Sequence, residues 1–405
     1  MSVVDSLELY FVNFPLPAPF SPAWLPHVVR HSSSFYLVRL RSDDGAEGFS
    51  AFNAVGRERA GSGDALAQLL LGKSVHDIDH VQQMLRIPAI GGIRNFWVEP
   101  AFWDIQGKLA GRPVCELLGG QRCRLKLYSS CGEDRDAAAR IEEAHAHREA
   151  GFEMMKLRVH ADEAADIRQV QETARALEGK MRFAVDCNQA FHNFAVGAGP
   201  VWDLARAKRF ADACHDAGLV WVEEPLHMEW QAEQAELAAY SRVPIAGGEV
   251  HTAGYYELAH MVERRCYDIF QPDAMWTGGI SQTMALAKKV REAGLKFTSH
   301  SWSSSIGFAV NLQIMAASGF AGEIEFEYPY SPPGWSEEVN SALFKEPIAR
   351  EGGWLEVPDR PGLGFEIDEE ALAHYGRCFF RANRKTSVWM PEALRDLSIP
   401  APLKN

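Results

Sequence analysis

From about residue 125 the chain alternates short apolar runs with longer amphipathic segments. The runs FEMMKLR, MRFAVD and LVWVEE have the length and composition of buried parallel strands. The segments between them, such as 162–178 and 203–217, have the periodicity of helices. This pattern continues for about seven units and ends near residue 330. Because right-handed βα units repeated about eight times close into a barrel, we predict a barrel. The rival doubly wound sheet is disfavoured because no GxGxxG motif follows a first strand.

The two ends of the chain have a different pattern. Residues 1–60 predict a β-rich opening, in which SSFYLVRL is a strand and Asp44-Gly45 marks a hairpin turn. Residues 64–118 have helical periodicity, whereas 330–405 are rich in Pro and Gly and are expected to return to the N-terminal part. The segment FPLPAPFSPAWLP predicts either a surface linker or a loop that folds over a ligand.

A charged or titratable residue stands at the expected C-terminal end of each predicted strand. These residues follow one another at intervals of 24 to 37 positions, about one βα unit, and are Lys156, Asp186, Glu223, Glu249, Asp273, His300 and Glu327. Each alone is more often a helix cap, a solvated loop residue or a structural residue. Seven in register indicate one site at the end of the barrel where such enzymes place catalysis. The three successive carboxylates, with no sulfur or imidazole among them, suit a hard cation.

Composition narrows the class of protein. The chain has 405 residues, of which 47% are hydrophobic and 23% charged, and its net charge is −13. No basic cluster is dense enough for nucleic acid or an anionic membrane, so we expect neither partner. No apolar run reaches the length of a membrane span, and the first residues lack the pattern of a signal peptide. The seven cysteines are scattered without a CxxC pair, which favours reduced thiols and a cytoplasmic protein.

The motifs DCNQ, WVEEP, GGE, QPDAMWTGGIS and TSHSW, in this order, resemble the mandelate racemase subgroup of the enolase superfamily. AFWDIQGKLAGRPVCELLGG and WLEVPDRPGLGFEID resemble the signatures of its N-terminal and C-terminal parts. The resemblance implies an α/β protein: a modified TIM barrel, (β/α)7β, over residues 126–350. It also implies an α+β capping domain over 1–125 that the segment 351–405 completes. A homo-oligomer such as an octamer is expected by the same resemblance.

The resemblance also implies roles for the strand-end residues. It places Mg²⁺ on Asp186, Glu223 and Glu249, and it selects Glu223 over the adjacent Glu224. His300 resembles the base that removes an α-proton, with Asp273 hydrogen-bonded behind it to fix the tautomer. Glu327 resembles the group that donates a hydrogen bond to the enediolate oxygen. That role needs a protonated carboxyl group, so we expect the pKa of Glu327 to be raised.

The sequence departs from this family at the second predicted strand. The racemase pattern is Lys-x-Lys, in which the second lysine is the base on the opposite face of the substrate, whereas this chain has Lys156-Leu157-Arg158. Lys156 can still neutralise the substrate carboxylate. Arg158 keeps its proton at working pH and is a poor base. The sequence therefore predicts one good base and one fixed cation.

One base is sufficient for β-elimination. We therefore predict an Mg²⁺-dependent dehydratase that converts a small hydroxy-carboxylate, an aldonate or aldarate, to a 2-keto-3-deoxy acid. The alternatives are a racemase or epimerase acting α to a carboxylate, and a catalytically silent member of the family. The residues expected to contact the substrate are Asn188, Trp302, His27 and Arg30, with His31 nearby. His27, Arg30 and His31 are either ligands for hydroxyls or a second carboxylate, or plain surface residues; Trp302 is either a pocket wall or core.

Overall fold

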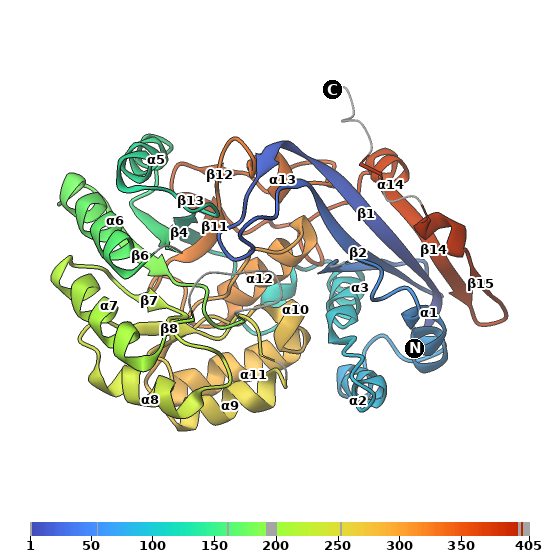
Figure 1. Ribbon diagram of the computed structural model, residues 1–405. Helices are drawn as coiled ribbons and strands as arrows, with labels where there is room; N and C mark the ends of the chain where they lie inside the picture. The colour runs from blue at the N-terminus through green and yellow to red at the C-terminus, as the bar shows by residue number, and fades with distance from the viewer. Residues whose placement is uncertain are drawn as a thin grey trace.

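The computed structural model describes residues 2–54, 56–159, 162–191, 201–251, 253–395 and 398–399. It contains a β/α barrel and a capping domain that lie side by side (Figure 1). This arrangement confirms the predicted fold class. Within these residues, no helix combines the length and the apolar character needed to cross a membrane.

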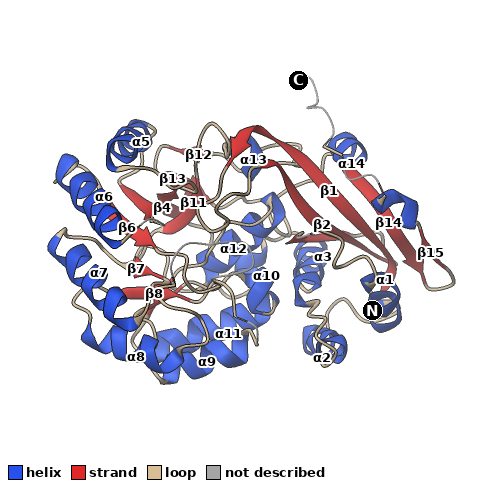
Figure 2. Cartoon of the chain, viewed as in Figure 1, coloured by secondary structure: helices blue, strands red, loops and turns tan. Residues whose placement is uncertain are grey.

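The barrel consists of parallel strands with helices outside them (Figure 2). Its strands are β4 (Arg124–Ser130), β5 (Met154–Arg158), β6 (Arg182–Asp186), β7 (Val222–Glu223), β8 (Ile245–Gly247), β9 (Ile269–Phe270), β10 (Lys296–Phe297) and β11 (Phe326–Pro329). Consecutive strands pair from β4 through to β10, and β11 pairs with β4, which brings the last strand back to the first. The helices are α5 (Ala137–Glu149), α6 (Glu163–Ala176), α7 (Leu204–Asp216), α8 (Gln231–Tyr240), α9 (Tyr255–Glu263), α10 (Ala274–Thr277), α11 (Gly279–Glu292) and α12 (Ser305–Ala317).

The capping domain is built on an antiparallel sheet with the order β15-β14-β1-β2-β3. Its N-terminal elements are β1 (Val4–Phe20), β2 (Arg30–Ser42), β3 (Glu47–Asn53), α1 (Ser62–Leu70), α2 (Ile78–Ala89), η1 (Phe96–Val98), α3 (Pro100–Ala110) and α4 (Val114–Leu117). The expected turn at Gly45 joins β2 to β3, and its φ of 89° is one that glycine adopts without strain. Gly48 on β3 lies so close to α3 that a Cβ atom would fall 1.9 Å from the carbonyl oxygen of Ala101.

The C-terminal segment serves both parts of the molecule. It contains α13 (Glu337–Asn340), β12 (Arg350–Glu351), β13 (Trp354–Glu356), α14 (Glu369–Tyr375), β14 (Gly376–Asn383), β15 (Ser387–Trp389) and η3 (Pro391–Leu394). The β12–β13 hairpin pairs with the first residues of β4, at the barrel. The chain joins the capping sheet afterwards, where β14 pairs with β1. The segment therefore completes the capping domain from β14 onward, and its first part covers the barrel.

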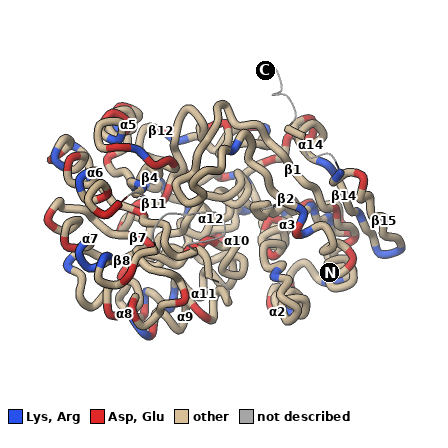
Figure 3. Tube along the Cα trace, viewed as in Figure 1, with Lys and Arg blue, Asp and Glu red and all other residues tan. Residues whose placement is uncertain are grey.

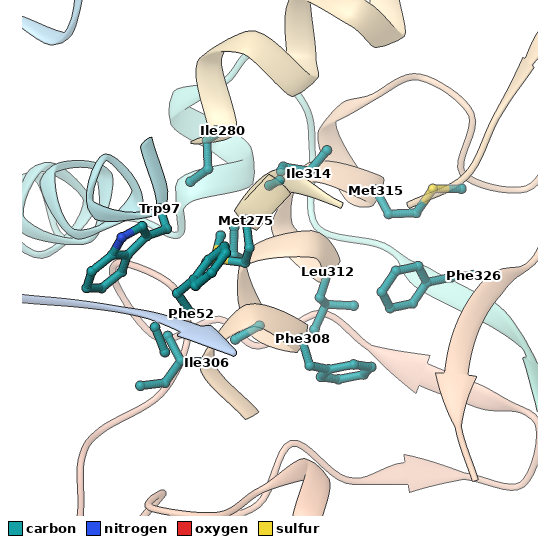
Figure 4. Packing of buried hydrophobic residues seen from close by; sticks show 14 of the residues in the cluster. Phe52, Trp97, Met275, Ile280, Ile306, Phe308, Leu312, Ile314, Met315 and Phe326 are labelled. Carbon is teal, nitrogen blue, oxygen red and sulfur yellow. The ribbon is translucent and has the colours of Figure 1, made fainter. Parts of the chain in front are cut away.

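One apolar core runs from the capping domain into the barrel. Figure 4 shows Phe52 of β3 and Trp97 of η1 close to Met275 of α10 and Ile306 of α12. The ring of Phe52 also meets Trp276 edge-on, with centroids 4.5 Å apart. Burial of this apolar surface fixes the capping domain against the C-terminal ends of the barrel strands.

A buried carboxylate adds a polar connection between the two parts. Glu99, which precedes α3, accepts hydrogen bonds from the backbone N–H groups of Ile280 (2.8 Å) and Ser281 (3.1 Å) in the first turn of α11. A carboxylate at a helix N-terminus satisfies donors that have no partner within the helix.

Charged side chains lie mainly on the outer helices. Figure 3 shows Lys and Arg interspersed with Asp and Glu along α5 to α9. All seven cysteines fall within the described residues, and each is a free thiol.

Candidate active site

The strand-end residues meet in one buried cluster where the barrel faces the capping domain. The register of the sheet places Arg158, Asp186 and Glu223 side by side at the ends of β5, β6 and β7. Asp273 follows β9 as the N-cap of α10, and His300 follows β10. The structure therefore brings together the residues that the spacing predicted.

Lys156 is the centre of the charged network. Its Nζ lies 2.6 Å from Glu223 Oε1, 2.8 Å from Glu327 Oε1 and 3.7 Å from Asp186 Oδ2. Burial opposes its charge, but Glu223 and Glu327 outweigh burial and raise the pKa of Lys156 well above its ordinary value. Lys156 is therefore a fixed ammonium group and not a base.

Arg158 is held by several partners at once. Its Nε donates to the carbonyl oxygen of Cys131 at 2.8 Å, and its Nη1 donates to Asp186 and, at 3.0 Å, to Asn188 Oδ1. Its Nη2 donates to Ser130 Oγ at 3.3 Å. Burial opposes the charge of Arg158, but Asp186 and its other neighbours raise its pKa above the ordinary value. The guanidinium cannot exchange protons with a substrate.

His300 and Asp273 form a hydrogen-bonded pair. His300 Nδ1 lies 3.1 Å from Asp273 Oδ2, and His300 Nε2 lies 3.3 Å from Glu249 Oε2. Burial lowers the pKa of His300, but the carboxylates of Glu249 and Glu327 raise it to about 9. An Nδ1–H that donates to Asp273 leaves Nε2 as the nitrogen that takes up or releases a proton.

Asp273 is in turn held by a residue that the sequence analysis did not identify. Asn311 on α12 donates from Nδ2 to Asp273 Oδ1 at 2.9 Å and accepts from the backbone N–H of Ala274 at 3.1 Å. Asp273 Oδ1 also accepts from the N–H of Met275. The signal for Asn311 is an amide in the middle of the apolar run FAVNLQIM, because a polar group in a buried helix needs a partner.

The prediction that Glu327 is protonated, with a raised pKa, is wrong. Burial raises the pKa of Glu327, but the charges of Lys156 and His300 outweigh burial and lower this pKa to about 2. Glu327 Oε2 also accepts a hydrogen bond from the N–H of Ser301 at 2.8 Å, which favours the carboxylate. Glu327 is therefore ionised here and accepts hydrogen bonds. Glu325, two residues earlier, pairs with Arg182 outside the cluster.

The predicted metal ligands lie in this cluster but face cationic side chains. Asp186 pairs with Arg158, Glu223 with Lys156, and Glu249 with His300. In the part of the chain that the structure describes, no set of three or more His, Cys, Asp or Glu side chains is arranged to hold a metal ion.

The composition of the cluster nevertheless fits a divalent cation. Lys156, Arg158 and His300 are its cationic groups, whereas its carboxyl groups are Asp186, Glu223, Glu224, Glu249, Asp273 and Glu327. Among the residues that the structure describes, neither carboxyl oxygen of Glu224 finds a hydrogen-bond partner. Burial, and then the neighbouring carboxylates, raise the pKa of Glu224. Burial also raises the pKa of Glu249, although His300 opposes it. Excess negative charge on hard oxygen donors is stabilised by Mg²⁺.

A cavity of about 760 Å³ opens on one side of this cluster. Among the predicted site residues, its lining includes Arg158, Asn188, Glu249, His300, Trp302 and Arg30. It does not include Lys156, Asp186, Glu223, Asp273 or Glu327, which lie beneath those side chains, nor does it include His27. His27 is exposed on the surface, so it is not brought to the cavity. His31, its neighbour in sequence, does line it.

Aromatic side chains form one wall of the cavity. Trp302 stacks on Phe20 with ring centroids 5.7 Å apart, and it meets Trp335 at 4.9 Å and Trp24 edge-on at 5.2 Å. The guanidinium of Arg158 lies 5.0 Å from the ring centre of Trp24. The Pro-rich segment is therefore no surface linker: β1 runs through it to Phe20, and Trp24 reaches the cavity.

Comparison with known proteins agrees with this architecture. Residues 139–371 match the family described as enolase C-terminal domain-like. Residues 10–119 match the N-terminal domain of the mandelate racemase / muconate lactonizing enzyme family. The two matches cover the barrel and the capping domain.

Individual relatives are similar along most of their length. The chain is 30% identical over 350 residues to L-talarate/galactarate dehydratase of Salmonella typhimurium, covering 83% of this chain and 81% of the relative. It is 26% identical to D-galactarolactone cycloisomerase of Agrobacterium fabrum, covering 92% and 98%. A solved structure of mutant L-talarate/galactarate dehydratase liganded with Mg and L-glucarate has a TM-score of 0.78 at 26% identity, covering 94% and 93%. With both family domains matched in order, the chain belongs to the mandelate racemase / muconate lactonizing enzyme family of the enolase superfamily.

Proposed function

We propose that this protein is an Mg²⁺-dependent acid-sugar dehydratase. The observation that carries the proposal is the His300–Asp273 pair, which faces the same cavity as a guanidinium that cannot act as a base. The similarity to L-talarate/galactarate dehydratase supports the same class of reaction. The substrate is an aldonate or aldarate, a small hydroxy-carboxylate. A homo-oligomeric assembly remains a prediction.

The reaction uses His300 on one face of the substrate. Nε2 of the neutral imidazole accepts the proton from C2, while Asp273 stabilises the imidazolium that forms. The bond from C3 to its hydroxyl oxygen then breaks, and the proton delivered to that oxygen completes a molecule of water. The enol that remains ketonises by gaining a proton at C3 and losing the proton of its C2 hydroxyl group, which gives a 2-keto-3-deoxy acid. The imidazolium of His300 lies on the correct side to supply the proton to the leaving hydroxyl.

The fixed charges of the cluster orient the substrate. Lys156 and Arg158 present positive charge towards the substrate carboxylate, and their own carboxylate partners hold them in place. Asp186, Glu223 and Glu249 are the residues that would hold Mg²⁺, which supplies Lewis acidity that makes the α-proton more acidic and stabilises developing negative charge. The solved relative liganded with Mg supports Mg²⁺ as the cation.

An isomerase acting α to a carboxylate is the second candidate, because the chain also resembles D-galactarolactone cycloisomerase. Racemisation would need Arg158 or Lys156 to exchange a proton on the face opposite His300. The raised pKa values of both side chains argue against that role.

A library of acid sugars incubated with the purified protein and Mg²⁺ tests the proposal, with semicarbazide to detect 2-keto acids. At least one acid sugar should give a 2-keto acid, and His300→Asn should lower its turnover by roughly 10²- to 10⁴-fold, the range for loss of a general acid–base. His145→Asn, an exposed residue on α5, is the matched control and should not change the rate. Epimerisation without any 2-keto acid, or unchanged turnover in His300→Asn, would refute the dehydratase.

A further inference from the structure

Arg30 is a cationic side chain of the cavity that differs from Arg158 in its surroundings. Arg30 is the first residue of β2 and pairs with Phe20 of β1, and it lines the same cavity as His300. Arg158 is satisfied by Asp186 and further acceptors. By contrast, within the described residues the guanidinium of Arg30 has no hydrogen-bond or ion-pair partner.

A half-buried guanidinium without a counter-charge is costly. Burial lowers the pKa of Arg30 below its ordinary value, and no neighbouring carboxylate offsets that effect. Arginine nevertheless remains charged, so the cost of burial is relieved when an anion enters the cavity. The carboxylate that lines the cavity in the described part of the chain is Glu249, and it lies 3.3 Å from His300.

Hydroxyl and amide side chains near Arg30 suit the hydroxyl groups of an acid sugar. Ser32, Ser33 and Ser34 follow it along β2, and all three line the cavity with Asn13 of β1. Ser34 Oγ donates to Asn13 Oδ1 at 2.9 Å, so hydroxyl and amide groups are already hydrogen-bonded together there. These groups can donate to and accept from sugar hydroxyls.

We propose that Arg30 binds a second carboxylate at the far end of the substrate, so that the preferred acid sugars are diacids. A guanidinium offers two parallel N–H donors that match a carboxylate. This inference rests on the proposed function for the identity of the first carboxylate, which Lys156 and Arg158 face. It adds that the end remote from the chemistry also carries a negative charge.

The test compares an aldarate with the aldonate of the same length and configuration. The unaltered enzyme should have the higher kcat/KM for the aldarate. Arg30→Met should lower kcat/KM for the aldarate by about 10- to 100-fold, as expected for loss of a charge-assisted hydrogen bond, and should lower it much less for the aldonate. Arg30→Lys should recover part of the loss, because it keeps the charge without the two parallel donors.

Arg41→Met is the matched control. It removes the same charge from the same strand, but Arg41 is half exposed, pairs with Glu47 and does not line the cavity. Its kcat/KM should follow that of the unaltered enzyme for both acids. A preference of the unaltered enzyme for the aldonate, or equal losses for both acids in Arg30→Met, would overturn the second-carboxylate site.

A binding experiment separates this inference from the proposed function. Adipate and hexanoate have six carbons and no hydroxyl groups, so neither can be dehydrated. Isothermal titration should show tighter binding of adipate, and Arg30→Met should remove the difference. If adipate shows this Arg30-dependent preference while no acid sugar is dehydrated, the dehydratase fails and the second-carboxylate site stands. If aldonates are dehydrated while adipate binds no better than hexanoate, the dehydratase stands and the second-carboxylate site fails.

Discussion

Arg158 decides which reactions the site can perform. Its donors are used by Cys131, Asp186, Asn188 and Ser130, so the side chain is both charged and immobile. A lysine at this position could lose its proton and serve as a base, whereas a guanidinium cannot. The reaction is therefore driven from the face where His300 lies. This conclusion could be drawn from the sequence, because it depends on residue type and strand position alone.

The charge of Glu327 can be tested by replacing it with an isosteric amide. In Glu327→Gln the negative charge that raises the pKa of His300 is lost, so that pKa falls. The neutral imidazole then forms at lower pH, and the rising limb of the pH–kcat profile moves to lower pH. We expect kcat itself to fall by about tenfold or more, because the Lys156 ammonium loses a partner.

Glu325→Gln is the control for this change, because Glu325 pairs with Arg182 away from the cluster. Its profile should match that of the unaltered enzyme. If Glu327→Gln keeps full kcat with an unshifted profile, Glu327 acts through a donated hydrogen bond from a neutral group, and the ionised state assigned here is incorrect.

The state of Glu327 could not be predicted from the sequence because it depends on distances across the barrel. A buried carboxyl group beside other carboxylates is expected to be protonated. Here Lys156 of β5 lies 2.8 Å from Glu327 of β11, six strands later in the sequence, and reverses that expectation. Asn311 was missed for a similar reason: its partner Asp273 lies 38 residues earlier, and the chain pattern does not connect the two.

Among the secondary-structure elements, the barrel strands were predictable and the end of β1 was not. β5 and β6 are apolar runs that end at a charged residue, and both are found where the sequence indicates, whereas Glu327 is the second residue of β11 and not its last. Proline lacks the backbone N–H group that a strand donates, so the prolines of residues 14–20 made a linker one of the two predictions for this segment. Pro15, Pro17 and Pro19 alternate, so the missing N–H groups fall on one side of β1, which is compatible with an edge.

The interface between α5 and β4 should make stability depend on pH. His147 of α5 is buried and its Nδ1 lies 2.9 Å from Ser129 Oγ of β4. Burial, together with the charges of nearby arginines, lowers the pKa of His147 to about 3. The folded protein therefore keeps the ring neutral, while the unfolded chain takes up a proton below about pH 6.5. The free energy of unfolding should fall as the pH drops from about 6.5 towards 3, by up to about 1.4 kcal/mol per pH unit.

Urea unfolding of the unaltered protein and of His147→Gln at pH 7.5, 6 and 5 measures this contribution. The variant should be less stable at pH 7.5 but should lose less stability on acidification. His145→Gln, on the exposed face of the same helix, should keep the pH dependence of the unaltered protein. Identical slopes for His147→Gln and the unaltered protein would show that another group is responsible.

In the whole molecule, the capping domain and the barrel act as one unit. The core around Phe52 and Trp97 and the hydrogen bonds from Ile280 and Ser281 to Glu99 hold the capping domain over the strand ends. The family resemblance predicted this architecture. The path of the C-terminal segment was less predictable, because the β12–β13 hairpin pairs with β4 before β14 reaches the capping sheet.

The excess of buried carboxylates should make the stability of the whole molecule depend on divalent cations. Mg²⁺ that binds only the folded protein should raise the melting temperature. At a free Mg²⁺ concentration of a hundred times its Kd, the free energy of unfolding should increase by about 2.7 kcal/mol. EDTA should reverse the rise. Glu249→Gln should lose most of it, whereas Glu257→Gln, whose carboxylate pairs with His251 instead, should retain it. An equal rise in Glu249→Gln would show that Mg²⁺ binds elsewhere.

The central claim, proton removal from one face followed by loss of water, is tested most directly by proton NMR of the reaction in D₂O with Mg²⁺ and a responsive acid sugar. We expect a 2-keto-3-deoxy acid that carries deuterium at C3, and remaining substrate that keeps its configuration at C2. Accumulation of the C2 epimer labelled with deuterium, without 2-keto acid, would contradict it.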